Sequence, residues 1–269
     1  MPEMPEMEAY RQNLIRWALG RTVVGLDAPR PKRLNQPVDV VRAAILRRPV
    51  ARIERRGKSL ALILGRDNSA AILYIHLMLG GRIRFVPEDQ EAAVSCYLSD
   101  NHAVYFHVGL GRIDLMDHTA LAARWDKLGV EPLESDFKPG LLRRAFHARR
   151  RSIKACLTDQ NVVSGIGNVY SDEILYRVRL YPGTPANALD ADDWEALDTT
   201  IPEVLSEAVT RGGVGEPTDP DDRLTGGYRT HLQVHYRAGA PCGRGDTVMK
   251  EEIAGRTTYW CPSVQMPRS

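Results

Sequence analysis

DQNVVSGIGNVYSDEILYRVRLYP, residues 159–182, decides the fold of the second half of this chain. An amphipathic segment breaks at Gly165 and Gly167, and we expect a new helix to start at about Asn168. Two glycines permit a tight turn that exposes backbone N–H groups at a helix N-terminus, an anion site suited to a phosphate. Asn168 can cap the helix and also donate its amide to that phosphate. A plain helix-turn-helix used only for packing is the alternative.

Two basic runs lie outside this stretch. RRAFHARRRSIK covers Arg143 to Lys154 directly upstream, and RIERRGK covers Arg52 to Lys58. Clustered Arg and Lys can neutralise phosphates and release counterions, whereas a solvated basic surface explains either run alone equally well. The net charge of the 269 residues is only +2, so the distribution of charge, and not its sum, points to a nucleic acid.

The first half of the chain has a β-rich pattern. Residues 7–19 favour a helix with one apolar face, which Gly20 can end. From 21 to 116, short β-rich runs alternate with Gly, Asn, Asp and Pro, and a helix is expected at 37–47. Hydrophobic content of 43% and charged content of 26% are ordinary for a soluble protein. The pattern predicts a β-sandwich that carries the N-terminal helix.

The second half is predominantly helical. A linker rich in Pro, Gly and acid covers 129–140, and Gly, Asp and Pro at 212–230 indicate a mobile loop. The tail alternates as a hairpin does. We therefore predict an α+β protein with an N-terminal β-sandwich domain at 1–128, a linker at 129–140, a helical domain at 141–230 and a C-terminal β-hairpin at 231–269.

The first three residues contain a possible nucleophile. If Met1 is removed, Pro2 has a free secondary amine with the carboxylate of Glu3 beside it. A free α-amine has a pKa of about 7.7–8.0, so it is partly unprotonated near neutral pH and can attack an electrophilic carbon. A helix start explains the same residues, because Pro tolerates the first turn and acids favour the N-terminal dipole.

The four cysteines, Cys96, Cys156, Cys242 and Cys261, are widely spaced. No stretch approaches the roughly 20 apolar residues of a membrane span, and the acidic start is unlike a secretory signal. We therefore expect a cytoplasmic protein, in which this spacing argues against a disulfide framework.

These stretches together make the chain resemble the formamidopyrimidine-DNA glycosylase and endonuclease VIII family of base-excision repair enzymes. The similarity runs nearly end to end. It is carried by MPEMPEME (1–8), RRGKSL (55–60), IHLMLGGRIRF (75–85), GRIDL (111–115), LGVEPLESDF (128–137), IKACLTDQNVVSGIGNVYSDEILY (153–176) and AGRTTYWCP (254–262). The resemblance implies a helix-two-turn-helix DNA-binding domain, a C-terminal finger, and a bifunctional DNA glycosylase and abasic-site lyase.

The resemblance also implies catalytic residues. Pro2 would attack C1′ of the damaged nucleoside and form a Schiff base. Glu3 would act as general acid on the sugar ring oxygen and in proton transfers. Lys58 would contact a DNA phosphate near the lesion. Elimination at the β position, or at β and δ, would then cut the strand.

DNA-binding residues follow from the resemblance in the same way. Asn168, in the two-turn motif, and Arg256, at the tip of the final hairpin, would grip backbone phosphates. Further DNA-binding positions are Lys154, Gly165, Gly167 and His76. Glu6 and Glu173 also fall on family positions, and ordinary surface or helix-supporting chemistry is the alternative for them and for Lys154.

The C-terminal finger departs from the family pattern of two C-x2-C pairs that bind zinc. The first pair here is Cys242-Gly-Arg-Gly245 and the second is Cys261-Pro-Ser-Val264, so Cys242 and Cys261 are remnants of a four-cysteine site. Two thiolates do not complete a tetrahedral site. We expect no metal and no other cofactor, and a hairpin that holds Arg256 by packing of Tyr259 and Trp260. Rescue by His231 and His235, on one strand face, is the alternative.

A second departure concerns the residues that fill the gap left by a flipped base. The family commonly uses Met, Arg and Phe, and the matching positions here are Leu79, Gly109 and Leu110. Gly109 cannot pair with the orphaned opposite base, whereas a leucine wedge can still unstack bases. This predicts weak reading of the opposite base. It shifts the expected substrate from oxidised guanine opposite cytosine toward other lesions, abasic sites, or single-stranded and bubble DNA.

The sequence therefore predicts a monomeric, nucleoid-associated repair enzyme whose partner is damaged DNA and not a membrane. A non-enzymatic protein that binds damaged or abasic DNA is an alternative, although pure binding has no need of the Pro2-Glu3 pair. An interaction module that uses the hairpin and the basic run on RNA or protein is a third possibility.

Overall fold

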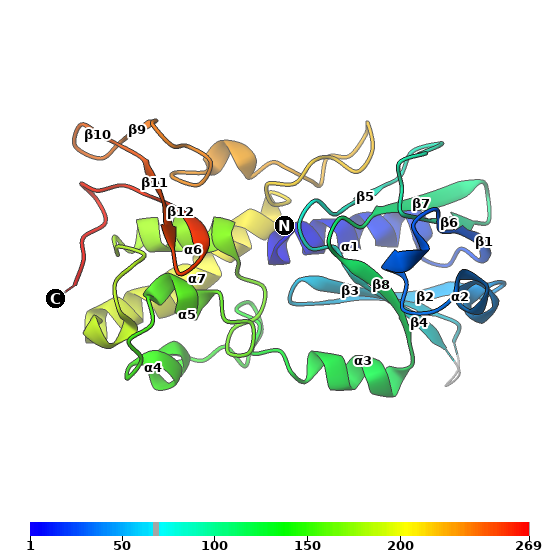
Figure 1. The fold of residues 1–269 in the computed structure, drawn as a ribbon, viewed down its shortest axis with the longest axis horizontal. Helices are drawn as coiled ribbons and strands as arrows, with labels where there is room; N and C mark the ends of the chain where they lie inside the picture. Colours follow the sequence, from blue (N-terminus) through cyan, green and yellow to red (C-terminus); the bar gives the residue numbers. More distant parts are fainter. Residues whose placement is uncertain (67–69, 269) are drawn as a thin grey trace. The chain divides into compact units, whose positions relative to one another are not determined.

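The computed structural model describes residues 1–66 and 70–268 (Figure 1). The chain forms two compact units. The first contains Met1–Lys127 and Arg211–Gly227, and the second contains Leu128–Thr210 and Tyr228–Ser269. The sequence places residues 212–230 in the helical domain, but most of this segment belongs to the first unit.

Two four-stranded antiparallel sheets build the first unit, in the orders β1-β6-β7-β5 and β2-β3-β4-β8. Helix α1 contacts β2 and β3 of one sheet and β7 of the other. Its residues Met7, Tyr10, Leu14 and Ala18 are buried in the core that both sheets share. The elements are α1 (Met4–Ala18), β1 (Val23–Asp27), η1 (Pro31–Arg33), α2 (Val38–Ile45), β2 (Val50–Arg56), β3 (Ser59–Leu64), β4 (Ala71–His76), β5 (Arg82–Arg84), β6 (Val94–Leu98), β7 (His102–His107), β8 (Arg112–Met116) and α3 (His118–Trp125).

The predicted α+β class with a sandwich and an N-terminal helix is confirmed. The β-rich runs that the sequence indicates, TVVGL, SLALILG, AAILYIHLML, RIRFV and AVYFHVGL, do not include β2, β6 and β8. β2 contains most of the basic run at 52–58, and only Val50 and Ile53 of this strand are buried. These two buried residues are three positions apart, whereas a half-buried strand is recognised by apolar residues at every second position. The sequence signal for β2 is therefore weak.

The second unit is helical and ends in two small antiparallel hairpins, β9-β10 and β11-β12. The sequence predicts a single hairpin in this tail, and the residues from Leu232 to Ala240 form neither of the two. The elements are α4 (Leu141–Phe146), α5 (Ile153–Leu157), α6 (Asn168–Arg177), η2 (Ala186–Ala188), α7 (Ala191–Thr210), η3 (Arg229–His231), β9 (Pro241–Cys242), β10 (Asp246–Thr247), β11 (Met249–Ile253) and β12 (Arg256–Trp260).

The segment 211–227 is held to α1, contrary to the expected mobile loop. Asp222 accepts hydrogen bonds from the Thr218 backbone at 2.7 Å, the Leu224 backbone at 2.8 Å and the Asn13 amide at 3.2 Å. Asn13 is fully buried and also donates to Thr225. Burial alone would raise the pKa of Asp222, but the hydrogen bonds from Thr218, Thr225 and Leu224 outweigh it and lower the pKa. A buried, ionised carboxylate therefore organises this segment.

Within the described ranges 1–66 and 70–268, no helix is both long and apolar enough to cross a membrane.

Candidate active site

The proposed nucleophile and acid lie at the start of α1. Glu3 is the N-cap of this helix and is only 2% exposed, while Pro2 directly before it is half-buried. Glu3 and Glu6 form a reciprocal capping box, in which the Glu6 carboxylate accepts from the Glu3 backbone N–H at 2.8 Å. The helix-start and nucleophile interpretations are thus compatible, because the cap orders the residues that would react.

Glu6 connects this N-terminus to the segment 211–227. Its second carboxylate oxygen accepts from the Val214 backbone N–H at 2.8 Å. Gly213 has a φ of 68°, and a Cβ there would lie 2.2 Å from Glu6 Oε1, so the contact requires glycine. Glu6 is 3% exposed, which excludes the surface role that was the alternative. Its position supports both the helix cap and the segment beside it.

Lys58 lies in the turn between β2 and β3 and is mostly buried. The turn is possible because Gly57 has a φ of 55°. Arg55 donates to the Gly57 carbonyl at 3.2 Å and to Glu8 of α1 at 3.1 Å. Arg11 also pairs with Glu8, at 2.7 Å. These contacts tie the lysine turn to the helix that begins after Pro2 and Glu3.

The contacts of Glu8 with Arg11 and Arg55 form a brace between α1 and the turn that carries Lys58. This brace depends on the charge of Glu8. Burial alone would raise the pKa of Glu8, but the hydrogen bonds and charges of Arg11 and Arg55 outweigh it and lower the pKa. Glu8 and Arg55 lie within stretches quoted from the sequence, but neither is among the predicted site residues. They became recognisable only when the turn and the helix were seen together.

His76 ends β4 opposite Arg112 of β8. Burial lowers the pKa of His76, and the positive charges of Lys58 and Arg124 lower it further. The imidazole is therefore neutral at physiological pH, so it can offer DNA an N–H donor but no positive charge. Its electrostatic coupling to Lys58 places these two predicted residues in one neighbourhood.

Leu79 and Leu110 protrude from two neighbouring loops of the first unit. They are 62% and 63% exposed, and the Leu110 backbone N–H donates to the Leu79 carbonyl at 3.2 Å. Gly109 fits closely beneath them, since a Cβ at this position would lie 2.2 Å from the same carbonyl oxygen. The three predicted void-filling residues are therefore together, and no side chain fits at 109 in this backbone.

The two-turn motif of the second unit positions Asn168 as the first residue of α6, after the N-cap Gly167. Gly165 has a φ of 94° and donates its N–H to Gln160 at 3.0 Å. The Gln160 amide in turn donates to the Ile166 carbonyl at 2.8 Å. Among the described residues the buried Asn168 Oδ1 has no hydrogen-bond partner. The described residues therefore leave this oxygen able to accept a hydrogen bond from water or a ligand.

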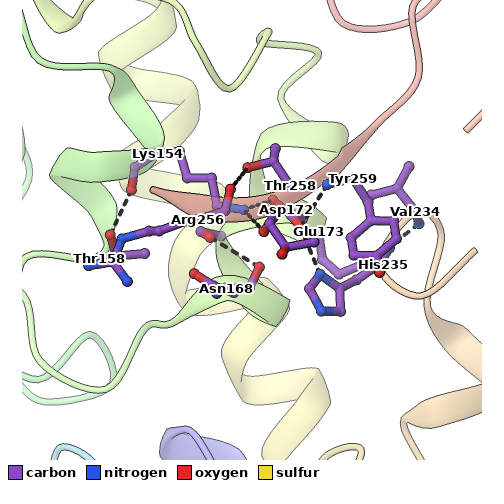
Figure 2. A network of polar contacts seen from close by, with 12 residues as sticks. Lys154, Thr158, Asn168, Asp172, Glu173, Val234, His235, Arg256, Thr258 and Tyr259 are labelled. Carbon is purple, nitrogen blue, oxygen red and sulfur yellow. Dashed lines mark hydrogen bonds and ion pairs between the residues drawn. The ribbon is translucent and has the colours of Figure 1, made fainter. Parts of the chain in front are cut away.

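Lys154 does not face solvent, which contradicts its prediction as a DNA-binding residue. Its side chain is fully buried, and Nζ donates to Asp172 Oδ1 at 2.6 Å and to the Thr257 carbonyl at 3.0 Å (Figure 2). An ammonium group engaged in this way inside the protein is not free to neutralise a phosphate. The basic run from Arg143 to Lys154 therefore contains both a buried lysine and exposed arginines. Arg143, Arg144, Arg149, Arg150 and Arg151 are exposed at its surface.

Glu173 has a structural role within the second unit. Its carboxylate accepts from the backbone N–H groups of Gln233 at 2.8 Å, Val234 at 3.0 Å and His235 at 2.8 Å. Burial raises the pKa of Glu173, and these backbone donors oppose the shift without cancelling it. The residue fixes the segment that leads into the finger (Figure 2).

The cysteines of the finger form a Cys242–Cys261 disulfide, contrary to the expectation of no disulfide. In the fold, Cys242 of β9 lies next to Cys261, which directly follows β12. Val264, at the position of a missing ligand, packs against the apolar cluster that contains both cysteines. The sequence does not reveal this contact, because the two cysteines are 19 residues apart and meet only through the fold of two hairpins.

The finger residues do not fit a zinc ion. His231 lies in a 3₁₀ turn and His235 is buried against Asp172, so the two histidines do not share a strand face. The described part of the chain contains no cluster of three or more His, Cys, Asp or Glu side chains arranged for a metal. Two sulfurs bonded to each other also lack the thiolate charge that zinc requires.

The fold and site define a class of DNA-processing enzymes, in which a β-sandwich with an N-terminal Pro-Glu pair accompanies a helix-two-turn-helix unit. Family models support this class. The formamidopyrimidine-DNA glycosylase N-terminal domain matches residues 1–111, and the formamidopyrimidine-DNA glycosylase H2TH domain matches residues 128–218. The chain belongs to the formamidopyrimidine-DNA glycosylase family.

Individual relatives agree over almost the whole chain. The formamidopyrimidine-DNA glycosylase of Chloroflexus aurantiacus is 36% identical, over 99% of this chain and 98% of its own length. The formamidopyrimidine-DNA glycosylase of Geobacillus kaustophilus is 32% identical, over 98% of this chain and 100% of its own length. A Lactococcus lactis Fpg bound to DNA with an abasic site has a TM-score of 0.89 at 27% identity, covering 98% of this chain and 99% of that one. The same values hold for its complex with DNA containing an oxidised pyrimidine.

Proposed function

We propose that this protein is a DNA glycosylase of base-excision repair with abasic-site lyase activity, and that Pro2 is its nucleophile once Met1 is removed. The observation that carries the proposal is the capping box, which orders Glu3 and Glu6 directly beside Pro2. Membership of the glycosylase family supports the same reaction. We further propose that the enzyme works at the DNA of the nucleoid.

The reaction begins with attack by the Pro2 nitrogen on C1′ of the damaged nucleoside. The bond from C1′ to the base breaks, and the base leaves with a proton. Glu3 supplies a proton to the sugar ring oxygen, so the ring opens and C1′ becomes an iminium carbon bonded to Pro2. Because a positive iminium acidifies C2′, loss of a C2′ proton expels the 3′ phosphate. Water then releases the enzyme.

Access to C1′ requires the nucleotide to leave the base stack. We propose that Lys58, Asn168 and Arg256 hold backbone phosphates while the nucleotide is displaced. Leu79 and Leu110 would enter the gap as an apolar wedge. With glycine at 109, the enzyme would read the opposite base weakly, which favours abasic and oxidised pyrimidine lesions. The Lactococcus lactis relative is known in complexes with both kinds of DNA.

Borohydride trapping tests the lyase step. It reduces the Schiff base to a stable amine, so incubation with abasic duplex should give a covalent adduct that peptide mapping assigns to Pro2. The matched control is a chain that keeps an extra N-terminal residue, because Pro2 is then a tertiary amide without an available lone pair. We expect no adduct from this control. Absence of an adduct from the processed protein with both abasic and oxidised DNA would refute the lyase proposal.

A cleavage panel tests the substrate proposal. Defined lesions are placed in single-stranded DNA and opposite each of the four bases. We expect cleavage rates that vary little with the opposite base. Tight binding of abasic DNA with no turnover, unchanged by Glu3→Gln, would instead identify a damage-binding protein.

A further inference from the structure

The outer edge of β12 is completed by side chains instead of a third strand. β12 pairs with β11 through Thr257 opposite Glu252 and Tyr259 opposite Lys250. On its other edge, the Thr257 carbonyl accepts from Lys154 at 3.0 Å and the Tyr259 N–H donates to Asp172 at 3.1 Å. An isolated two-stranded ribbon is marginally stable in water. These contacts therefore give the hairpin the support that it lacks by itself.

Asp172 is the centre of this support. One carboxylate oxygen accepts from Lys154 at 2.6 Å, and the other accepts from His235 Nδ1 at 2.7 Å as well as from Tyr259. Asp172 and Lys154 are both fully buried. A buried carboxylate is tolerated only when charges and donors compensate its lost hydration. Its partners come from three separate segments, so this single carboxylate joins α5, the segment before β9, and β12 to α6 (Figure 2).

The two residues proposed to hold phosphates lie on elements that Asp172 connects. Asn168 is four residues before Asp172 on α6, hence on the same face of that helix. Arg256 begins β12 and immediately precedes Thr257, whose carbonyl Lys154 holds. β12 packs directly against α6. Asp172 and Lys154 thus contact both elements that carry the two proposed phosphate contacts.

We propose that Asp172, supported by Lys154 and His235, is a positioning residue that fixes Arg256 relative to Asn168 and does so without zinc. The ionic contacts and the Cys242–Cys261 disulfide take the place of a four-cysteine metal cage, which the residues of this finger do not fit. The inference rests on the proposed function, since it assigns phosphate contacts to Arg256 and Asn168.

A double-mutant cycle tests the coupling between Asp172 and Arg256 in the full-length protein. The probe is a duplex with a tetrahydrofuran abasic analogue, and the dissociation constant is measured over a series of salt concentrations. Arg256→Ala should lower the slope of log K against log salt by about 0.9, the value of one lost phosphate contact. Asp172→Asn should weaken binding and lower the slope similarly. The double variant should bind no more weakly than Arg256→Ala, because Asp172 acts through that arginine.

Further readouts separate positioning from general instability. Single-turnover cleavage at saturating enzyme should stay within about twofold of the wild-type rate in Asp172→Asn, since only binding is affected. Asp193→Asn is the matched control, because it removes the ion pair between the mostly buried Asp193 and the partly exposed Arg268 of the same unit. Its salt slope should equal that of the wild type. If Asp172→Asn does not fold, His235→Phe replaces it, since phenylalanine keeps the ring against Tyr259 and loses the bond to Asp172.

Three results would overturn the inference. They are an unchanged salt slope in the tested variant, additive losses in the cycle, and stoichiometric zinc in the purified protein by mass spectrometry. Wild-type protein that fails to bind the abasic duplex would instead refute the proposed function, so the two failures are distinguishable.

Discussion

The backbone N–H of Leu110 donates to the carbonyl of Leu79 at 3.2 Å, and this bond joins the two most exposed leucines of the first unit. Exposed leucines contribute little to folding, so their pairing at two loop tips indicates a surface that becomes buried in a complex. Gly109 completes the arrangement because its missing Cβ lets the loops approach closely.

Truncation of this wedge should separate duplex opening from chemistry. We expect Leu79→Ala with Leu110→Ala to slow cleavage of a lesion in duplex DNA by about tenfold or more, since each step of unstacking costs a few kcal/mol. Cleavage of abasic single-stranded DNA, which needs no opening, should remain near the wild-type rate. Thermal unfolding should change little, because both side chains are exposed. Equal losses on the two substrates would contradict a wedge role.

Gly109→Arg should not create a reader of the opposite base. Because its Cβ would clash with the Leu79 carbonyl, the loops must separate. We expect a loss of stability of about 1–3 kcal/mol, typical of an overpacked site, and a lower rate of duplex cleavage. Urea unfolding and cleavage opposite cytosine and adenine would check this. A gain in discrimination at unchanged stability would disprove the proposed steric restriction.

The Glu8–Arg55 brace should make stability depend on acid pH. The folded-state pKa of Glu8 is lowered, so its contribution is present above the unfolded pKa and is lost as pH falls through the folded value. We expect Glu8→Gln to destabilise the protein at pH 7 by about 1–3 kcal/mol, as for a hydrogen-bonded charge. The difference from wild type should shrink as the pH is lowered below 4.5, the ordinary value for this carboxyl. Denaturant titrations at both pH values measure it.

The same substitution should also reduce catalysis, because Arg55 supports the Gly57 carbonyl beside Lys58. Arg42→Gln is a suitable control, since it removes exposed ion pairs of the same unit at a distance from this turn in the sequence. Unchanged single-turnover cleavage in Glu8→Gln would show that the brace serves folding alone.

The disulfide can be measured directly by thiol alkylation. Under denaturing conditions without reductant, only Cys96 and Cys156 should react, and all four cysteines should react after reduction. The bond joins two cysteines that are 19 residues apart in the sequence. For a loop of this size, the chain-entropy model gives a stabilisation of the folded state of about 3 kcal/mol. Cys242→Ser should therefore lower the stability of the finger, whereas Cys96→Ala should leave the alkylation pattern of the finger intact. Four reactive thiols before reduction would exclude the bond.

Anchoring of the segment 211–227 should depend on Asp222. Asp222→Asn removes the charge that its hydrogen-bond donors favour, so limited proteolysis within the segment should become faster. We expect removal of a damaged base to slow more than cleavage at a preformed abasic site, because only the first step needs a pocket for the base. Proteolysis at the wild-type rate would show that other contacts hold the segment.

Local sequence patterns predicted much of the fold. The face formed by Met7, Tyr10 and Leu14 predicted α1, and alternating β-rich runs predicted a sandwich. Gly165 and Gly167 placed the start of α6 at Asn168. These features depend on side-chain periodicity and on backbone freedom within a few residues, so a short stretch of sequence is enough to predict them. Family resemblance added the proposed catalytic roles of Pro2 and Glu3.

Only the tertiary structure decided which distant groups meet. Asp172 binds Lys154, His235 and Tyr259, which lie 18, 63 and 87 residues away along the chain. No period or spacing encodes such pairs, because they arise when packed elements bring separate segments together. The sequence by itself therefore determined α1, several strands of the sandwich and the glycine turns, and it indicated Pro2 as a possible nucleophile. Folding decided that Lys154 is buried, that Cys242 meets Cys261, and that a carboxylate supports the finger, since burial and partnership are properties of the assembled chain.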